Sequence, residues 1–212
     1  MYHDYMTSKT VILADGSFPA HEIPLGYLRN AEHIICCDGS AKRLLEAGIE
    51  PEAIVGDLDS LSDEIEEKYS DRLYRDEDQD TNDLTKAVEW CINKEYKDIV
   101  ILGATGKRED HTIGNISLLA EYAKKIDVIM VTDTGIVSPH LESCTISSFP
   151  GEQVSVFSIN PLTRITSSGL KYKLNNLKLK NWWRATLNEA TGSSVSIKFS
   201  GGPIIVYRKF KD

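Results

Sequence analysis

Residues 99–120 read IVILGATGKREDHTIGNISLLA and combine a strand, a glycine-rich turn and a helix in that order. The first four are apolar, as in a strand that is buried on both faces. Further on, Ile116, Leu119 and Ala123 recur with the spacing of one helix face. A strand that passes through a turn into a helix is the repeating unit of a parallel, doubly wound sheet.

The same unit occurs several times before residue 140. Four more apolar runs have the length of a buried strand, at residues 11–13, 34–37, 53–55 and 128–131. Helix-spaced apolar residues separate them, including the segment from Leu84 to Ile92. We therefore predict an α/β fold with an N-terminal doubly wound, mostly parallel sheet, whose ligands lie beyond the carboxyl ends of the strands.

The pattern changes after Pro139. Short alternating segments follow without a helical period, at residues 153–157, 170–179, 194–199 and 204–207. They predict a C-terminal antiparallel β-sandwich, and hence two domains, 1–139 and 140–212. The second is small for an independent domain, so we expect it to bury apolar strands against a second copy in a homodimer.

Composition excludes several classes of protein. The 212 residues are 41% hydrophobic and 26% charged, which is typical of a folded chain, and the net charge of −8 argues against nucleic acid or anionic membranes as partners. No apolar run approaches the ~18 residues of a membrane span, and the start lacks a signal sequence, so we expect a cytoplasmic protein. The four cysteines contain no C-x-x-C pair, which argues against a disulfide framework or a cysteine zinc site.

Gly56-Asp57-Leu58-Asp59-Ser60 directly follows a predicted strand. In an extended segment Asp57 and Asp59 face the same side, and two such carboxylates suit Mg²⁺ together with substrate phosphates. The alternative is an Asx-type turn, with Ser60 or Ser62 capping the next helix.

A second acidic cluster spans residues 76–83, with five acidic residues in eight positions. Asn82 is a candidate N-cap, which places Asp83 in the first helical turn and Lys86 on the same face, opposite the apolar stripe and available to a phosphate. A solvated loop beside the helix dipole is the alternative, but it does not explain so much acid.

The glycine-rich turn offers a phosphate cradle. Gly103 and Gly106 allow close backbone approach, Lys107 and Arg108 supply positive charge, and a helix begins next. The spacing is not that of a Walker A loop. On the helix, His111 and Asn115 share a face near Asp110, and Asp38-Gly39 follows another strand, so we expect all four motifs to converge at one sheet edge.

Together these motifs resemble the thiamine pyrophosphokinase family. The resemblance rests on Asp38-Gly39, residues 56–60, residues 78–80 with Asp83 and Lys86, and the segment from Gly103 to His111. It implies a Mg²⁺-dependent transferase that moves pyrophosphate from ATP, the co-substrate, to thiamine, and a homodimer whose thiamine site involves both domains. By matching positions it implies Asp57, Asp59 and Asp83 as magnesium ligands.

From the motifs and the resemblance we predict two sets of site residues. The catalytic set is Asp38, Asp57, Asp59, Asp83, Lys86, Arg108 and Asp110. The binding set is Gln79, Asp80, Gly103, His111, Asn115, Trp182 and Asn188. Thiamine is a cation, so Trp182 and Trp183 are candidates for an aromatic wall, and Asp110 or Asp80 for the group that takes the hydroxyl proton.

The sequence departs from the family pattern in several places. Asn82 stands where Thr is frequent, Ala104 and Lys107 replace glycines, and Leu187 replaces a serine.

Two other interpretations stay open on the residues alone. One is a nucleotide-sugar transferase with an Asp-x-Asp metal site, and the other is a non-catalytic sensor that binds nucleotide or thiamine.

Overall fold

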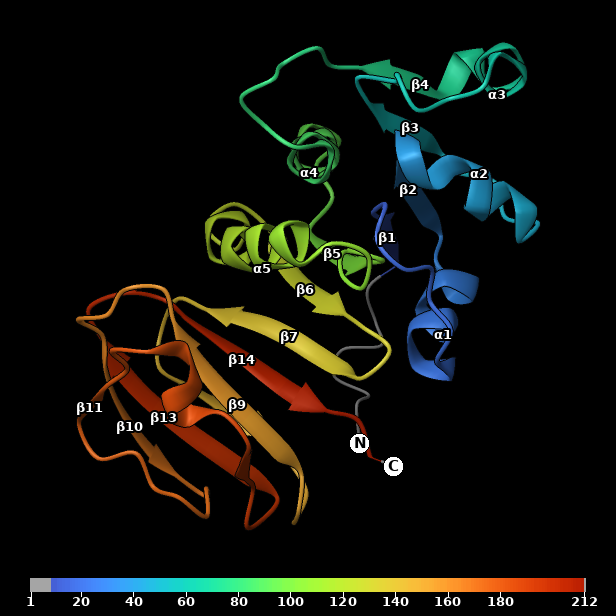
Figure 1. The fold of residues 1–212 in the computed structure, drawn as a ribbon. Coiled ribbons are helices and arrows are strands. Elements are labelled where there is room, and N and C mark those ends of the chain that lie inside the picture. Colours follow the sequence, from blue (N-terminus) through green and yellow to red (C-terminus); the bar gives the residue numbers. More distant parts are fainter. Residues whose placement is uncertain (1–8, 212) are drawn as a thin grey trace.

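The computed structural model describes residues 9–211, which form one sheet of ten strands and one of four (Figure 1). The larger sheet has the order β12-β9-β14-β7-β6-β5-β1-β2-β3-β4, and its last six strands are parallel. These six are β1 (Thr10–Leu13), β2 (His33–Cys37), β3 (Ala53–Gly56), β4 (Leu73–Arg75), β5 (Asp98–Leu102) and β6 (Asp127–Val131). All five apolar runs are therefore strands, and β4 is an edge strand outside the predicted set.

Helices cover both faces of the parallel strands, with α4 and α5 on one side and α1 and α2 on the other (Figure 1). They are α1 (Glu22–Asn30), α2 (Asp38–Glu46), α3 (Asp63–Lys68), the 3₁₀ turn η2 (Ser70–Arg72), α4 (Asp83–Asn93) and α5 (Glu109–Tyr122). Ile12 belongs to the core under α4 and α5, while Val11 and Leu13 belong to the opposite core, as strand alternation requires. Within residues 9–211 no helix combines the length and apolar character needed to cross a membrane.

The position of β1 creates the crevice in which a ligand can bind. Val11 pairs with Ile34 of β2 on one side and with Val100 of β5 on the other. The chain builds β2, β3 and β4 outward from β1, then returns to add β5 and β6 on the other side. The loops after β1 and β5 therefore diverge, and such a switch point is where open α/β sheets bind ligands.

The C-terminal half is an antiparallel β-sandwich, as predicted. Its elements are β7 (Gly135–His140), β8 (Cys144–Ser147), β9 (Gln153–Ser158), β10 (Arg164–Ser168), β11 (Leu177–Lys178), η3 (Trp182–Ala185), β12 (Asn188–Glu189), β13 (Ser194–Ser200) and β14 (Ile204–Lys209). A third core, including Val156, Ile197 and Val206, joins the two sheets. The alternating segment predicted at residues 170–179 is not a continuous strand, because β11 and an isolated bridge from Leu170 to Ala190 are its only β-pairings.

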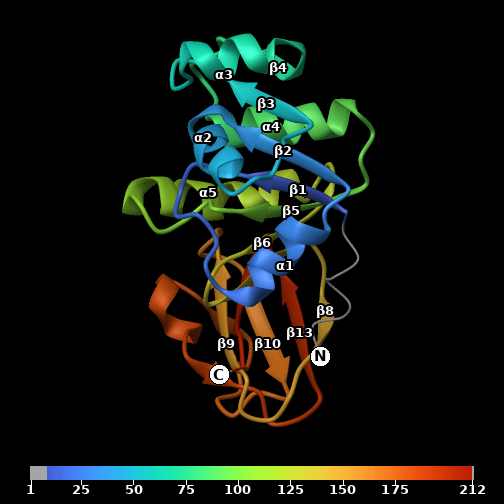
Figure 2. The same ribbon diagram turned by 90° about the vertical axis from the view of Figure 1, so that its right-hand side faces the viewer.

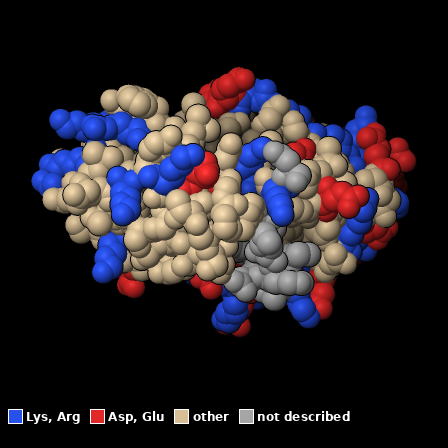
Figure 3. All heavy atoms as spheres, turned by 90° about the horizontal axis from the view of Figure 1, so that it is seen from below, with Lys and Arg blue, Asp and Glu red and all other residues tan. Residues whose placement is uncertain are grey.

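The two halves are stacked, with the α/β part above the sandwich in Figure 2. The large sheet nevertheless continues between them, because β7 pairs with both β6 and β14. A division at residue 139 stays a prediction. Seen from below, most of the surface of the sandwich is uncharged, and acidic side chains gather mainly toward the end with α2 and α3 (Figure 3).

Candidate active site

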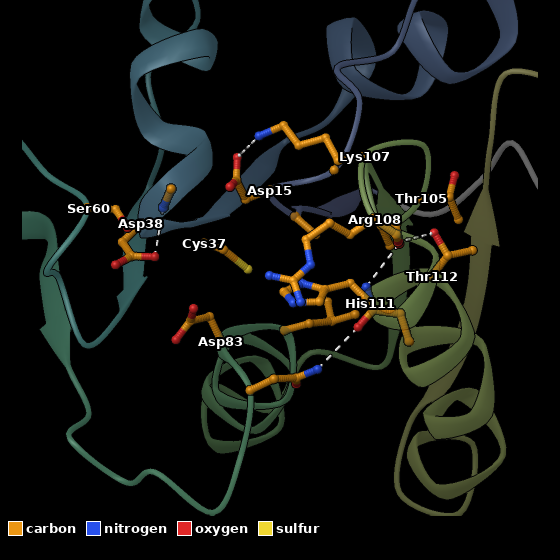
Figure 4. Close-up of a pocket in the computed structure, with 17 residues that line it drawn as sticks. Asp15, Cys37, Asp38, Ser60, Asp83, Thr105, Lys107, Arg108, His111 and Thr112 are labelled. Atoms are coloured by element: carbon orange, nitrogen blue, oxygen red, sulfur yellow. Dashed lines mark hydrogen bonds and ion pairs between the residues drawn. The ribbon is translucent and has the colours of Figure 1, made fainter.

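A cavity of about 330 Å³ opens at the carboxyl edge of the parallel strands, at the switch point (Figure 4). The loops after β1, β2, β3 and β5 and the first turns of α4 and α5 line it. The structure brings five of the predicted site residues to this lining: Asp38, Asp83, Arg108, His111 and Asn115. Segments far apart in sequence thus converge on one edge.

Asp38 is the most deeply buried acid of this cavity, with 3% of its surface exposed. Its Oδ1 accepts the N–H of Gly39 at 2.7 Å, while Oδ2 is buried without a hydrogen bond of normal geometry among the described residues. A Cβ on Gly56 would lie 2.8 Å from Asp38 Cγ, so only glycine lets β3 end against this carboxyl group. Burial raises the pKa of Asp38 to about 6, and the charges of Asp83 and Asp57 add to the rise.

The Asp57-Leu58-Asp59 segment is a turn, and the predicted pair of parallel carboxylates is wrong. Asp57 Oδ1 accepts the N–H of Asp59 at 3.1 Å, as in the alternative Asx-type turn. Leu58 has a φ of +69° and is 3% exposed, so its side chain enters the core while the backbone turns. Neither aspartate lines the cavity, although the charge of Asp57 reaches Asp38.

The acidic segment before α4 is a chain of similar turns. Asp76 Oδ1 accepts the N–H of Asp78 at 3.0 Å, and Asp78 Oδ1 accepts the N–H of Asp80 at 2.9 Å. Gln79 and Asp80 are exposed in this loop and lie outside the cavity lining. Nowhere in residues 9–211 do three histidine, cysteine, aspartate or glutamate side chains form a group that could hold a metal.

Asn82 begins α4 as predicted, since its Oδ1 accepts the N–H of Thr85 at 2.9 Å. Asp83 faces the cavity and Lys86 shares its helix face, as predicted, but the prediction that Lys86 is available to a phosphate is wrong. The Lys86 side chain is 3% exposed and its Nζ lies 3.4 Å from Asp83 Oδ1. The buried Lys86 ammonium group therefore compensates the charge of Asp83 from the protein interior, because a buried ammonium group needs a carboxylate partner.

The glycine-rich loop forms the other wall of the cavity. Arg108 binds Asp110 through two nitrogens, with 3.0 Å between Nε and Oδ1. This contact lowers the pKa of Asp110 to about 2, so Asp110 stays ionised at neutral pH. Asn115 is buried and fixes the loop, donating to the carbonyl of Ala104 at 2.9 Å and accepting from Asn82 at 3.1 Å.

Both halves of the chain match one family of enzymes. Residues 25–130 match thiamin pyrophosphokinase, catalytic domain, and residues 135–207 match thiamin pyrophosphokinase, substrate-binding domain. The chain belongs to the thiamin pyrophosphokinase family. The fold class and the resemblance predicted from the four motifs are confirmed, and so is the class of transferase. A nucleotide-sugar transferase and a non-catalytic sensor are not favoured.

Relatives match over most of their own length. Thiamine pyrophosphokinase of Bacillus subtilis is 29% identical over 214 residues, covering 94% of this chain and 98% of that protein. Thiamin pyrophosphokinase 1 of Caenorhabditis elegans is 29% identical, covering 82% and 78%. The crystal structure of the Bacillus subtilis thiamine pyrophosphokinase superposes with a TM-score of 0.78 at 28% identity, over 96% of this chain and 100% of that one.

The residues predicted in the substrate-binding domain lie away from the cavity. Trp182 packs edge-on against Phe157, with ring centroids 6.2 Å apart, and it lines a separate apolar groove. Asn188 is 3% exposed and both ends of its amide bind Tyr172, accepting the N–H at 3.0 Å and donating to the carbonyl at 2.7 Å. The structure thus gives Asn188 a structural role, which does not support its prediction as a contact to the vitamin.

Asp15 and Gly16 line the cavity and were outside the predicted set. They follow β1, where the sequence Ala14-Asp15-Gly16-Ser17 resembles an ordinary turn. The available signal was positional, because the loop after the central strand of a doubly wound sheet lies at the switch point. Ser60, the last residue of the motif at residues 56–60 and a candidate helix cap, also lines the cavity.

Proposed function

We propose that this member of the family transfers the pyrophosphoryl group of ATP to the hydroxyl of thiamine, with AMP as the leaving group. The observation that carries this proposal is the division of charge across the cavity. Asp38 and Asp83 lie on one wall, while Lys107 and Arg108 of the glycine-rich loop lie on the other. Such a site can hold a polyphosphate between basic residues and a cation.

The acidic wall suits Mg²⁺. Asp38 has a buried oxygen without a normal hydrogen bond, and its pKa is raised first by burial and then by the charges of Asp83 and Asp57. A hard cation that takes oxygen ligands would compensate these charges. From the family resemblance we propose Asp57, Asp59 and Asp83 as the residues that hold it. Asp83 faces the cavity, whereas Asp57 and Asp59 lie in the turn after β3, outside the lining, from where the charge of Asp57 reaches Asp38. When bound, the cation would neutralise charge on the phosphates.

The residues of the chain act mainly by positioning. Arg108 lies at the mouth of the cavity and would stabilise negative charge as the phosphoryl group moves, while Asp110 holds its guanidinium group in place. An aspartate with a pKa of about 2 is a weak base, so Asp110 does not suit removal of the hydroxyl proton. Asp80 is the remaining candidate, from the exposed loop before α4.

We place thiamine in the apolar groove beside Trp182, between the acidic loop that carries Gln79 and the substrate-binding domain. The groove beside Trp182 has a volume of about 190 Å³ and is lined by α5 and the large sheet. Aromatic rings suit a cationic heterocycle. Trp183 follows Trp182 in the chain, lies outside the lining of this groove and is 72% exposed, so its ring is available to a ligand.

A second copy of the chain would complete this region. Trp183 and Leu187 are 72% and 75% exposed, and Trp182 is 44% exposed, which is unusual for large apolar side chains on one short segment. We propose a homodimer in which they are covered. Light scattering should give twice the 23.7 kDa mass of the chain, and a concentration-independent monomer would contradict the proposal.

The test of the activity is to incubate the protein with ATP, Mg²⁺ and thiamine and to separate the products by chromatography. Thiamine diphosphate and AMP should appear in equal amounts, and neither should form when thiamine or Mg²⁺ is omitted. ADP with thiamine monophosphate would indicate transfer of a single phosphoryl group and would contradict the proposal. A cytoplasmic location stays a prediction.

A further inference from the structure

We propose that Lys107 determines the specificity of this site for a polyphosphate chain. Asp15 binds Lys107 in the free protein, and the phosphates of the nucleotide take the place of Asp15 as the partner of Lys107. This inference rests on the proposed function and adds Asp15 to its phosphate side, as the group that competes with the nucleotide for Lys107. The exchange moves one ammonium group from a carboxylate of the protein to a phosphate oxygen of the ligand.

Asp15 Oδ1 accepts hydrogen bonds from two cationic side chains at once. Lys107 Nζ lies 2.8 Å away and Arg43 Nη2 lies 2.5 Å away. The Lys107 side chain is 47% exposed and lines the cavity, whereas that of Arg43 is 29% exposed and lies outside the lining. Arg43 therefore keeps Asp15 paired when Lys107 leaves, so that release of Lys107 does not isolate the carboxylate.

The backbones that carry this pair are bound to each other. The N–H of Gly16 donates to the carbonyl of Gly103 at 2.5 Å, and the N–H of Ser17 donates to the carbonyl of Thr105 at 2.7 Å. The loop after β1 and the glycine-rich loop thus form one unit. Because their backbones are fixed, the exchange needs only rotation of the Lys107 side chain, which is long and half exposed.

The Asp15 carboxylate lies on the wall of the cavity, against the first turn of α2. A Cβ on Gly39 would lie 2.8 Å from Asp15 Oδ2, so glycine leaves room for this approach. Lys107 points toward Asp15 across the top of the cavity in Figure 4. An oxygen anion held by lysine and arginine is also the arrangement that binds phosphate, so Asp15 competes with a phosphate for the same ammonium group.

This competition selects among ligands by charge. An uncharged nucleoside cannot replace a carboxylate beside Lys107, whereas a triphosphate offers several anionic oxygens within one molecule. The alternative is that the Asp15 pair merely joins two loops. The two explanations differ in sign, because a competitor weakens ATP binding and a structural link supports it.

The experiment compares Lys107→Ala, Asp15→Asn and the double variant in the full-length protein, with Lys42→Ala as the control. Lys42 is 77% exposed on α2, pairs with Glu46 and lies outside the cavity lining. The readouts are the KM for ATP, the KM for thiamine, kcat, and calorimetric binding of ATP and of adenosine with Mg²⁺ present.

We expect Lys107→Ala to raise the KM and Kd for ATP about tenfold, the effect of one lost charge-assisted hydrogen bond, without changing the KM for thiamine. Asp15→Asn should lower both ATP constants about two- to fivefold, because an exposed ion pair is a weak competitor. In the double variant the effect of Asp15→Asn should disappear. Adenosine binding should be the same in all variants.

Changes of the same sign in the two single variants, or unchanged ATP constants, would overturn the inference. If the wild type forms thiamine diphosphate while these constants stay unchanged, the inference fails and the proposed function stands. If the wild type is inactive, calorimetry with ATP still decides, since the same opposite shifts in Kd are required. A wild type that does not bind ATP overturns the inference as well.

Discussion

The cavity at the switch point and the groove beside Trp182 differ in what a single chain supplies. Charged side chains from four separate segments meet at the cavity, and several of them are already paired, as Arg108 is with Asp110. Aliphatic and aromatic side chains and one serine line the groove, and Trp182 of this lining is 44% exposed. A single chain therefore already arranges the charged groups of the cavity. The groove leaves apolar surface exposed, which only a ligand or a second copy can cover.

The largest effect should come from the aspartates proposed to hold Mg²⁺. Asp57→Asn removes a charge proposed to hold Mg²⁺, so kcat should fall on the order of a hundredfold or more while the protein stays folded. Steady-state rates and thermal unfolding measure the two effects. Asp98→Asn is the control, because Asp98 is exposed at the opposite end of the parallel strands. Near-normal activity of Asp57→Asn at low Mg²⁺ would contradict the assignment.

Asp38 should make stability depend on pH. Its pKa is about 6 in the folded protein against an ordinary 3.8, so between these values the folded state keeps a proton that the unfolded chain has lost. The free energy of unfolding should therefore fall as pH rises from about 4 to about 6, and the full cost of the charged carboxylate remains above that range.

Asp38→Asn should remove this cost and raise the free energy of unfolding at pH 7.5 by on the order of 1 to 3 kcal/mol, with little gain at pH 4. Urea denaturation at both pH values, with Mg²⁺ chelated, measures the difference. Equal destabilisation at the two pH values would contradict this prediction, because the Asp38 side chain would then stabilise the fold whatever its charge.

The comparison also explains what the sequence could predict. Period-2 and period-3.6 patterns depend on burial, so β1 to β3, α2 and α4 were predictable, and the order of strands placed Asp38, Asp83 and Arg108 at one edge. Side-chain direction at the end of a strand depends on φ angles that such patterns do not report. The left-handed backbone conformation of Leu58 therefore changes the direction in which the Asp57 and Asp59 side chains point.

The burial of the Lys86 charge is a second feature that the sequence pattern could not predict. A lysine in an amphipathic pattern is normally solvated, but here Asp83 pairs with it at the bottom of the acidic wall. Asp15 was missed because its partners, Arg43 and Lys107, are distant in sequence and come together only through the fold.

An intermediate effect should appear at the groove. Trp182→Ala removes an aromatic ring that substrate and transition state would contact equally, so the KM for thiamine should rise about tenfold with kcat nearly unchanged. Tyr172→Ala is the matched control, since Tyr172 is also exposed and lies outside the groove lining. A fall in kcat without a change in the KM for thiamine would separate Trp182 from thiamine binding.

The smallest effect should come from Leu187, which has a φ of +54° and is 75% exposed in the single chain. A left-handed leucine is strained by roughly 1 to 2 kcal/mol, part of which glycine recovers. Leu187→Gly should therefore raise the free energy of unfolding by about 0.5 to 1 kcal/mol, while Leu187→Ser, which keeps a Cβ, should change it by less than about 0.5 kcal/mol. Chemical denaturation at several protein concentrations measures both. If Leu187→Ser costs several kcal/mol and the loss grows with protein concentration, Leu187 is buried by a second copy. The apolar region would then be closed by the dimer before thiamine binds.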